Sequence, residues 1–214
     1  MREGRGPIRI GLVDDHAVVR DGYKRYIALE SDLQVCLEAA TAEDAYLQLA
    51  NIRADVLVMD LSMPGRGGLE GIRRILARYP TQAILIFTMH EQADRALQCL
   101  RAGARGYMTK TESPDALIDA IRQIADGKTV VAQSLQAALQ VKQNDDQGSP
   151  HLALTPREFD IFLMLADGVS IEDIGQRLQL GTKTVSNYQT LIRQKLDIHN
   201  AVDLYRYAVA HGLL

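Results

Sequence analysis

The sequence predicts an α/β domain followed by a small all-helical domain. From residue 8 to about residue 126, short apolar runs typical of strands alternate with segments of helical periodicity. Such alternation indicates parallel strands that are joined by crossover helices. After about residue 151 the apolar residues recur at helical spacing alone. At 214 residues and 47% apolar content, the chain is long enough to build a core in each domain.

The first domain contains five predicted strands: IRIGLV, LQVCLEA, VLVMD, AILIFT and GYMT. Each run is short and largely apolar, and helical patterns alternate with the runs. The helix after the fourth strand is predicted to end at Gly103, a favourable residue just past a helix end. The last helix is predicted to begin with Ser113 as its cap and Pro114 in its first turn, and to end before Gly127.

A change of composition separates the two domains. Between Gln133 and Pro150 the chain is dominated by Gln, Asn, Asp, Gly and Ser. The first part of this segment is compatible with a helix, and its second part is typical of a linker. We therefore divide the chain into a first domain of residues 7–127, a linker of residues 128–151 and a second domain of residues 152–214.

The second domain is predicted to contain four helices. Thr155 and Glu158 form a T-x-x-E capping box before the first helix, and Ser170 is the predicted cap of the second. Only QLGT separates the second helix from the third, KTVSNYQTLIRQKL. Two short helices joined by about four residues with a glycine are typical of a helix-turn-helix motif. The fourth helix, NAVDLYRYAVAH, is predicted to end at Gly212.

Several classes of protein are disfavoured by composition. The net charge of -3 requires that any nucleic-acid site be a local patch. Cys36 and Cys99 stand far apart, outside any C-x-x-C or zinc-ligand pattern. The first apolar run is interrupted by Arg9 and Gly11, which a signal peptide does not tolerate, and the sequence has no run long enough for a membrane span. We expect a cytoplasmic protein that makes no membrane contact.

Three acidic residues are predicted to meet at one edge of the sheet. Asp14 and Asp15 end the first strand and Asp60 ends the third. Ligands of parallel α/β sheets bind at the carboxyl ends of the strands. Like charges about 4 Å apart cost about 4 kcal/mol at an effective dielectric constant near 20, so the cluster needs a cation or a raised pKa. Carboxylate oxygens suit Mg²⁺, which predicts a magnesium site.

Two further strand ends add a hydroxyl and an ammonium group. Thr88 closes the fourth strand and Lys110 follows the fifth. Directed at one carboxylate, these groups would bind a phosphoryl group that the carboxylate carries. Aspartate is a nucleophile in aspartyl-phosphate chemistry, which makes Asp60 a candidate phosphoacceptor.

The strand-end residues occur together as a recognisable set. Its members are Asp14-Asp15, Asp60, Met63-Pro64, Thr88, Tyr107 and Lys110. With this set, residues 7–127 resemble the receiver domain of two-component response regulators. The resemblance implies a (βα)5 flavodoxin-like fold with a parallel sheet.

The resemblance also assigns roles to these residues. It implies that Asp60 is phosphorylated and that Lys110 contacts the phosphate. Thr88 and Tyr107 would be the switch pair. The predicted ligands of Mg²⁺ are Asp14, Asp15, Asp60 and the backbone carbonyl of Ser62.

The second domain resembles the LuxR-type helix-turn-helix domain of the NarL/FixJ family. The matching pieces are LTPRE, LADGVS, DIGQRL and KTVSNYQTLIRQKL. In such a module the third helix enters the major groove of DNA. Its apolar residues Val185, Leu191, Ile192 and Leu196 are expected in the core. The predicted DNA contacts are Lys183, Ser186, Asn187, Tyr188, Thr190, Arg193 and Lys195.

The fourth helix offers a predicted surface for self-pairing. Its members are Leu204, Tyr207, Ala208 and His211. An equal alternative is that these residues close the core of their own domain.

Taken together, the two resemblances imply a response regulator that acts as a DNA-binding transcriptional regulator. The expected partners are a sensor histidine kinase that phosphorylates Asp60, double-stranded DNA, and a second copy of the chain. We do not expect a classical enzyme, although the receiver should catalyse its own Mg²⁺-dependent phosphotransfer and dephosphorylation. Two alternatives stay open: a receiver whose output is protein or RNA interaction, and a DNA binder that is independent of phosphorylation.

Overall fold

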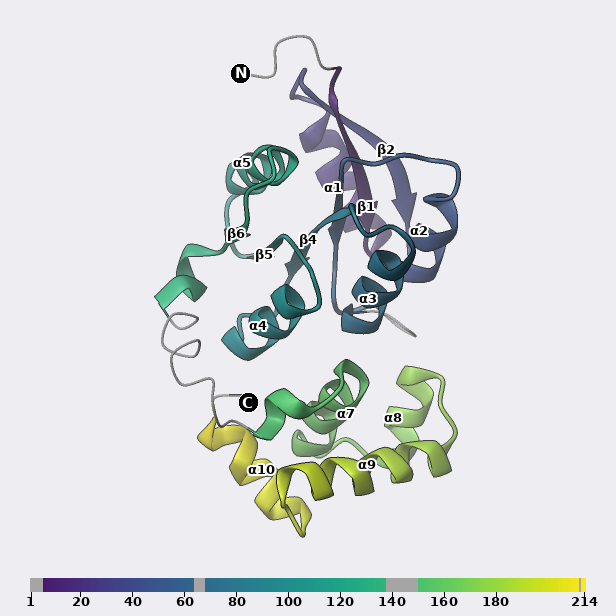
Figure 1. The fold of residues 1–214 in the computed structure, drawn as a ribbon, viewed down its shortest axis with the longest axis vertical. Helices are drawn as coiled ribbons and strands as arrows, with labels where there is room; N and C mark the ends of the chain where they lie inside the picture. Colours follow the sequence, from purple (N-terminus) through teal and green to yellow (C-terminus); the bar gives the residue numbers. More distant parts are fainter. Residues whose placement is uncertain (1–5, 64–67, 138–149, 212) are drawn as a thin grey trace. The chain divides into compact units, whose positions relative to one another are not determined.

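The computed structural model describes residues 6–63, 68–137, 150–211 and 213–214, which fall into two compact units (Figure 1). The first unit contains a sheet, and the second is built from helices. Predictions for Pro64, for the end of the last helix at Gly212 and for most of the linker lie outside the described residues. The described helices include none that is long and apolar enough to cross a membrane.

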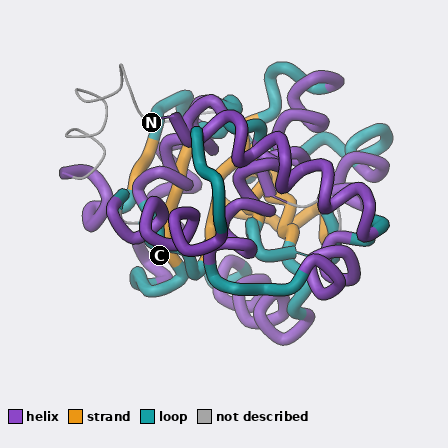
Figure 2. The backbone as a smooth tube through the Cα atoms, turned by 90° about the horizontal axis from the view of Figure 1, so that it is seen from below, coloured by secondary structure: helices purple, strands orange, loops and turns teal. Residues whose placement is uncertain are grey.

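The sheet of the first unit is parallel throughout, with the strand order β2-β1-β3-β4-β5-β6. Figure 2 shows its strands, in orange, side by side in one layer. Every residue of β3 and β4 is buried, as expected for central parallel strands covered on both faces. The strands are β1 (Ile8–Val13), β2 (Leu33–Ala39), β3 (Val56–Met59), β4 (Ala83–Thr88), β5 (Gly106–Thr109) and β6 (Val130–Val131).

Helices cover both faces of this sheet. The helices are α1 (Ala17–Ile27), α2 (Ala42–Gln48), α3 (Gly68–Arg78), α4 (Ala93–Arg101) and α5 (Pro114–Ala125). Helices α1 and α5 contact each other, and α2 contacts α3 (Figure 1). Alternating strands and helices around a parallel sheet confirm the predicted flavodoxin-like fold.

The predicted helix ends are confirmed by the backbone. The hydroxyl of Ser113 accepts a hydrogen bond from the N–H of Ala116, with Pro114 in the first turn. Gly103 and Gly127 have φ angles of 105° and 85°, a region that favours glycine. Local capping chemistry therefore sets the limits of α4 and α5.

A sixth strand lies in the segment that the sequence assigns to the linker. Val130 and Val131 pair with Gly106 and Tyr107 of β5. Two residues are too few to show the alternation that predicts a strand, so tertiary pairing defines β6. The following residues 133–137 are helical, in agreement with the helix allowed for the first part of the linker.

The second unit contains the four predicted α-helices, preceded by one 3₁₀ turn. The capping box of Thr155 and Glu158 is formed, and the hydroxyl of Ser170 accepts from the N–H of Asp173. Gln179, with a φ of 52°, caps the C-terminal end of α8, and Gly181 is the N-cap residue of the next helix. The elements are η1 (Pro150–Ala153), α7 (Pro156–Ala166), α8 (Ile171–Leu178), α9 (Thr182–Leu196) and α10 (Ala201–Ala210).

Two glycines of the first unit should respond to alanine in opposite directions. A Cβ atom at Gly106 would lie 2.8 Å from Leu85 Cδ1 and 3.0 Å from the carbonyl oxygen of Val130. We expect Gly106→Ala to lower the free energy of unfolding by about 1–3 kcal/mol through overpacking. Gly22 lies inside α1 with open space around it, so Gly22→Ala should raise that free energy by about 0.5–1 kcal/mol.

Differential scanning calorimetry of the full chain measures both changes. A destabilised Gly22→Ala protein, or a Gly106→Ala protein as stable as the parent, would contradict this description of the sheet and of α1.

Candidate functional site

Two acidic residues stand side by side because the strands before them are paired. Val13 at the end of β1 pairs with Met59 at the end of β3. Asp14 and Asp60 follow directly, and the N–H of Asp60 donates to the carbonyl oxygen of Val13 at 2.9 Å. Both acidic residues are buried, with exposed fractions of 7% and 4%. The structure therefore brings together the carboxylates that the sequence places at this edge.

Lys110 lies between the two carboxylates. Its Nζ atom is 2.6 Å from Asp14 Oδ2 and 2.8 Å from Asp60 Oδ2. Its main-chain N–H donates to the carbonyl oxygen of Thr88, which fixes the start of the loop after β5. Charge-assisted hydrogen bonds of this length are among the strongest in proteins. One ammonium thus compensates two buried negative charges.

The electrostatics keep Asp60 ionised. Burial raises the pKa of the Asp60 carboxyl, but the hydrogen bond from Lys110 and the backbone N–H of Ser62 outweigh it, so this pKa lies below its ordinary value. Burial likewise lowers the pKa of Lys110, yet its bonds to Asp14 and Asp60 raise that pKa overall. At neutral pH Asp60 is a carboxylate with a cation beside it, which is the state that a nucleophile requires.

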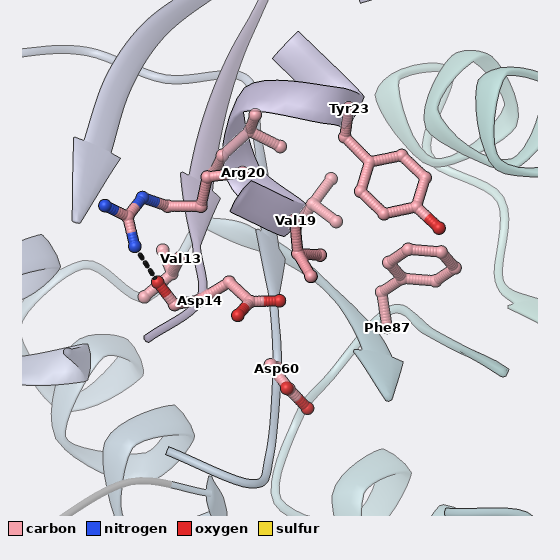
Figure 3. A pocket seen from close by; sticks show the side chains of 9 residues that line it. Val13, Asp14, Val19, Arg20, Tyr23, Asp60 and Phe87 are labelled. Atoms are coloured by element: carbon pink, nitrogen blue, oxygen red, sulfur yellow. Dashed lines mark hydrogen bonds between the residues drawn. The ribbon is translucent and has the colours of Figure 1, made fainter. Parts of the chain in front are cut away.

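Backbone and side-chain donors orient both loops. Asp14 Oδ1 accepts the N–H of His16 at 2.8 Å, and Asp60 Oδ1 accepts the N–H of Ser62 at 3.1 Å. Arg20 of α1 donates through Nη1 to the main-chain carbonyl of Asp14 (Figure 3). Sequence reasoning missed Arg20. A basic residue on the side of α1 that faces the acidic cluster was the available signal.

The acidic cluster can bind a metal ion. Asp14, Asp15, His16 and Asp60 offer ligand atoms that all lie within 4.8 Å of one another. The buried Oδ1 atom of Asp15 makes no hydrogen bond with the described residues, although His16 Nδ1 lies 2.9 Å away. Clustered carboxylate oxygens suit a hard divalent cation. The sequence did not predict that His16 would join this group.

The predicted switch residues meet at one loop. Thr88 and Tyr107 are both fully buried, and the Tyr107 hydroxyl donates to the carbonyl oxygen of His90 at 2.8 Å. The N–H of His90 lies 3.5 Å from Thr88 Oγ1, and His90 Nε2 lies 3.3 Å from Ser62 Oγ. Burial lowers the pKa of His90 to about 4 and raises that of Tyr107. His90, half-buried, connects the loops that follow β3 and β4.

The second candidate site lies on α9, the second helix of the helix-turn-helix motif. Val185, Ile192 and Leu196 are buried in the core, as predicted. Leu191 is not: 45% of it is exposed, so its assignment to the core was wrong. Among the predicted DNA contacts, the exposed residues are Lys183, Asn187, Thr190 and Lys195, and the half-buried ones are Ser186, Tyr188 and Arg193.

Lys195 has a structural partner. Its Nζ atom lies 2.6 Å from Glu158 Oε2, and this oxygen also accepts the N–H of Thr155 at 2.6 Å. Burial raises the pKa of the Glu158 carboxyl, but the bonds from Lys195 and Thr155 hold it below its ordinary value. The sequence predicts Lys195 as a DNA contact, and that role stays a prediction; in this structure its ammonium pairs with the capping-box residue Glu158 of α7.

For two of the four residues of the predicted self-pairing surface on α10, the structure supports the alternative that they belong to the core. Leu204 and Ala208 are 1% and 0% exposed because they close the core of their own unit. Tyr207 and His211 are half-buried, and their rings stack with centroids 4.0 Å apart. The large apolar side chains of α10 that are exposed are Val202, Tyr205 and Val209, at 59%, 54% and 47%.

Fold and site together define an α/β domain with an acidic pocket at its strand ends, followed by a helix-turn-helix domain. A family model for the response regulator receiver domain matches residues 10–122. A second model, for bacterial regulatory proteins of the luxR family, matches residues 152–208. The chain belongs to the response regulators of the NarL/FixJ type, with a receiver and a LuxR-type DNA-binding domain.

Individual relatives match along nearly the whole chain. Response regulator UvrY of Escherichia coli (strain K12) is 36% identical over 96% of this chain and 95% of its own length. Response regulator GacA of Pseudomonas aeruginosa is 36% identical over 97% of this chain and 98% of its own length. The fold also resembles that of RcsB from Salmonella enterica serovar Typhimurium bound to promoter DNA with the phosphomimetic BeF3−, with a TM-score of 0.68, 24% identity and coverage of 94% and 98%.

Two lysines of α9 should separate stability from DNA affinity. We expect Lys195→Ala to lower the free energy of unfolding of the helical unit by about 1–3 kcal/mol, because Glu158 loses its cation. Lys183→Ala should leave stability unchanged, because Lys183 is exposed. The Lys183→Ala change should also weaken DNA binding. The slope of the logarithm of the binding constant against the logarithm of the salt concentration should become shallower by about one, because one phosphate contact is lost.

Thermal unfolding and fluorescence-anisotropy titrations at several salt concentrations measure the two effects. A Lys195→Ala protein of unchanged stability would show that the ion pair contributes nothing to the fold.

Proposed function

We propose that phosphorylation of Asp60 by a sensor histidine kinase switches the binding of this response regulator to double-stranded DNA in the cytoplasm. The main support for this proposal is the position of the Lys110 ammonium, which lies 2.8 Å from Oδ2 of the buried, ionised Asp60. That arrangement supplies a nucleophile together with a cation for the charge that arrives on it.

The phosphoryl transfer can be written from these groups. A carboxylate oxygen of Asp60 attacks the phosphorus of the phosphohistidine of the kinase, forming an O–P bond as the N–P bond breaks and imidazole leaves. Lys110 then donates to a phosphoryl oxygen, and the hydroxyl of Thr88, buried at the end of β4, donates to another. The phosphate brings about 1.5–2 negative charges. The Lys110 ammonium, which now bonds the carboxylates of Asp14 and Asp60, would therefore bond the more strongly charged phosphoryl oxygens instead.

The proposed metal ion is Mg²⁺. Asp14, Asp15 and Asp60 would hold it, with the backbone carbonyl of Ser62 as a further ligand. When bound, Mg²⁺ would neutralise part of the phosphoryl charge. The same pocket would allow water to hydrolyse the aspartyl phosphate, which makes the receiver its own phosphatase.

The signal is proposed to leave the pocket through Thr88 and Tyr107. Both contact His90, through the weak bond to its N–H and the bond to its carbonyl oxygen. A phosphate that accepts a hydrogen bond from Thr88 would move the loop after β4, which contains His90, and would change the packing of Tyr107. Moving a switch from 1:99 to 99:1 requires about 5.5 kcal/mol, so the contacts of Lys110, Thr88 and Tyr107 must act together.

DNA binding is assigned to the exposed face of α9. The second helix of a helix-turn-helix motif lies in the major groove. We assign Lys183, Tyr188 and Arg193 to phosphates and Ser186, Asn187 and Thr190 to base edges. RcsB, whose fold is similar, is bound to promoter DNA in its solved structure, which is consistent with DNA binding by this chain.

Pairing of two copies is assigned to the exposed stripe of α10. Val202, Tyr205 and Val209 recur at spacings of three and four, so they share one face. A single module with few cations binds DNA weakly, and a dimer places two modules on two half-sites. This stripe replaces the buried residues Leu204 and Ala208 as the proposed homodimer contact.

Mass spectrometry tests the proposed phosphorylation. Incubation with acetyl phosphate and Mg²⁺ should add the mass of one phosphoryl group to Asp60 and increase affinity for genomic DNA fragments. Asp60→Asn should show neither change, because the amide cannot act as a nucleophile. Failure of the adduct to form when a chelator removes Mg²⁺ before acetyl phosphate is added would support the metal site. An unmodified Asp60 would refute the proposal.

The dimer contact is tested separately. Tyr205→Ala should leave the fold intact, because Tyr205 is 54% exposed, and should lower the cooperativity of binding to duplexes with two half-sites. Binding to a duplex with one half-site should not change. Analytical ultracentrifugation of the phosphorylated protein measures the pairing directly, and unaltered cooperativity would remove α10 from the interface.

A further inference from the structure

The outward face of α9 carries a leucine in line with its polar residues. Lys183, Asn187 and Leu191 follow one another at intervals of four, so they form a single ridge along the helix. All three side chains are exposed, Leu191 to 45%. The core of the domain does not require Leu191, because Val185, Ile192 and Leu196 already fill the opposite side of α9.

Thr190, which precedes Leu191, presents a less polar surface than a threonine usually does. Its Oγ1 atom donates to the main-chain carbonyl oxygen of Ser186 at 3.0 Å. The only proton of the hydroxyl is therefore used within the helix, and a base acceptor would have to compete with that carbonyl oxygen for it. What Thr190 offers to a ligand as a new contact is chiefly its methyl group. Leu191 and the methyl group of Thr190 thus form an apolar patch beyond the polar residues Lys183 and Asn187.

The major groove contains one apolar group that such a surface can recognise. Thymine presents its C5-methyl group there, and an apolar side chain or the methyl of threonine is its usual contact. We propose that Leu191 and Thr190 bind thymine methyl groups, so that each half-site contains A·T pairs opposite the C-terminal half of α9. This inference rests on the proposed function, because it assumes that α9 lies in the major groove.

The two halves of the ridge then differ in what they recognise. Asn187 can form hydrogen bonds to a base edge, and Lys183 can contact phosphate or guanine. Leu191 and Thr190 recognise shape and apolarity instead. Because the contact is to a methyl group, uracil in place of thymine removes it without changing the hydrogen-bonding pattern of the base pair.

The experiment uses the full chain, phosphorylated with acetyl phosphate. Selection from a random duplex library gives the preferred sequence, and each thymine of that duplex is then replaced in turn by deoxyuridine. We expect at least one position in each half-site at which the loss of the methyl weakens binding about fourfold. In Leu191→Ala, the thymine and uracil duplexes should bind almost equally at the position that Leu191 contacts.

Asn187→Ala is the matched control on the same ridge. It should weaken binding to thymine and uracil duplexes alike and keep the ratio between them. Because Leu191 is exposed, Leu191→Ala should retain the helical circular dichroism spectrum and melting temperature of the parent.

The outcomes separate this inference from the proposed function. Failure to select any duplex refutes DNA binding itself. Sequence-selective binding in which every uracil duplex binds as tightly as its thymine counterpart overturns only the methyl contact. A thymine preference that Leu191→Ala leaves unchanged overturns the assignment to Leu191.

Discussion

The rest of the first domain depends on one interaction, the ammonium of Lys110 between the carboxylates of Asp14 and Asp60. These two acidic side chains are buried next to each other, an arrangement that is costly without a cation. The pairing of β1 with β3 places the acids, and the loop after β5 places the lysine. The parallel sheet is thus the device that brings residues distant in sequence to one point.

A series of hydrogen bonds connects Asp60 in the pocket to Tyr107. The N–H of Ser62 bonds Asp60, Ser62 contacts His90, and His90 receives the hydroxyl of Tyr107. A new charge on Asp60 must change the first of these contacts and can therefore alter the last. In the second domain an ion pair has the opposite role: Lys195 and Glu158 fix the start of α7 and hold α9 at a constant position on it. One pair is arranged for change and the other for rigidity.

Most of the fold and of the pocket could be predicted from the sequence, because strand ends, capping residues and apolar periodicity are local signals. Asp60, Lys110 and the cap at Thr155 are of this kind. What the sequence could not show depends on tertiary contacts. Leu191 has the same apolar character as Ile192 and differs only in which side of α9 it occupies. The ion pair of Lys195 with Glu158 could not be predicted, and the place of Leu204 stayed open between the core and a self-pairing surface, because their contacts are with residues remote in sequence. Strand β6 and the bond from Arg20 were missed for the same reason.

The central claim is that Asp60 is a carboxylate held ready for a phosphoryl group by the cation beside it. Fluorine NMR of the protein with Mg²⁺ and beryllofluoride tests it most directly. The account predicts bound fluoride signals in the parent, their loss in Asp60→Asn, and weakened binding in Lys110→Met, which lacks the ammonium. Bound signals that persist in Asp60→Asn, or a parent protein without them, would contradict it.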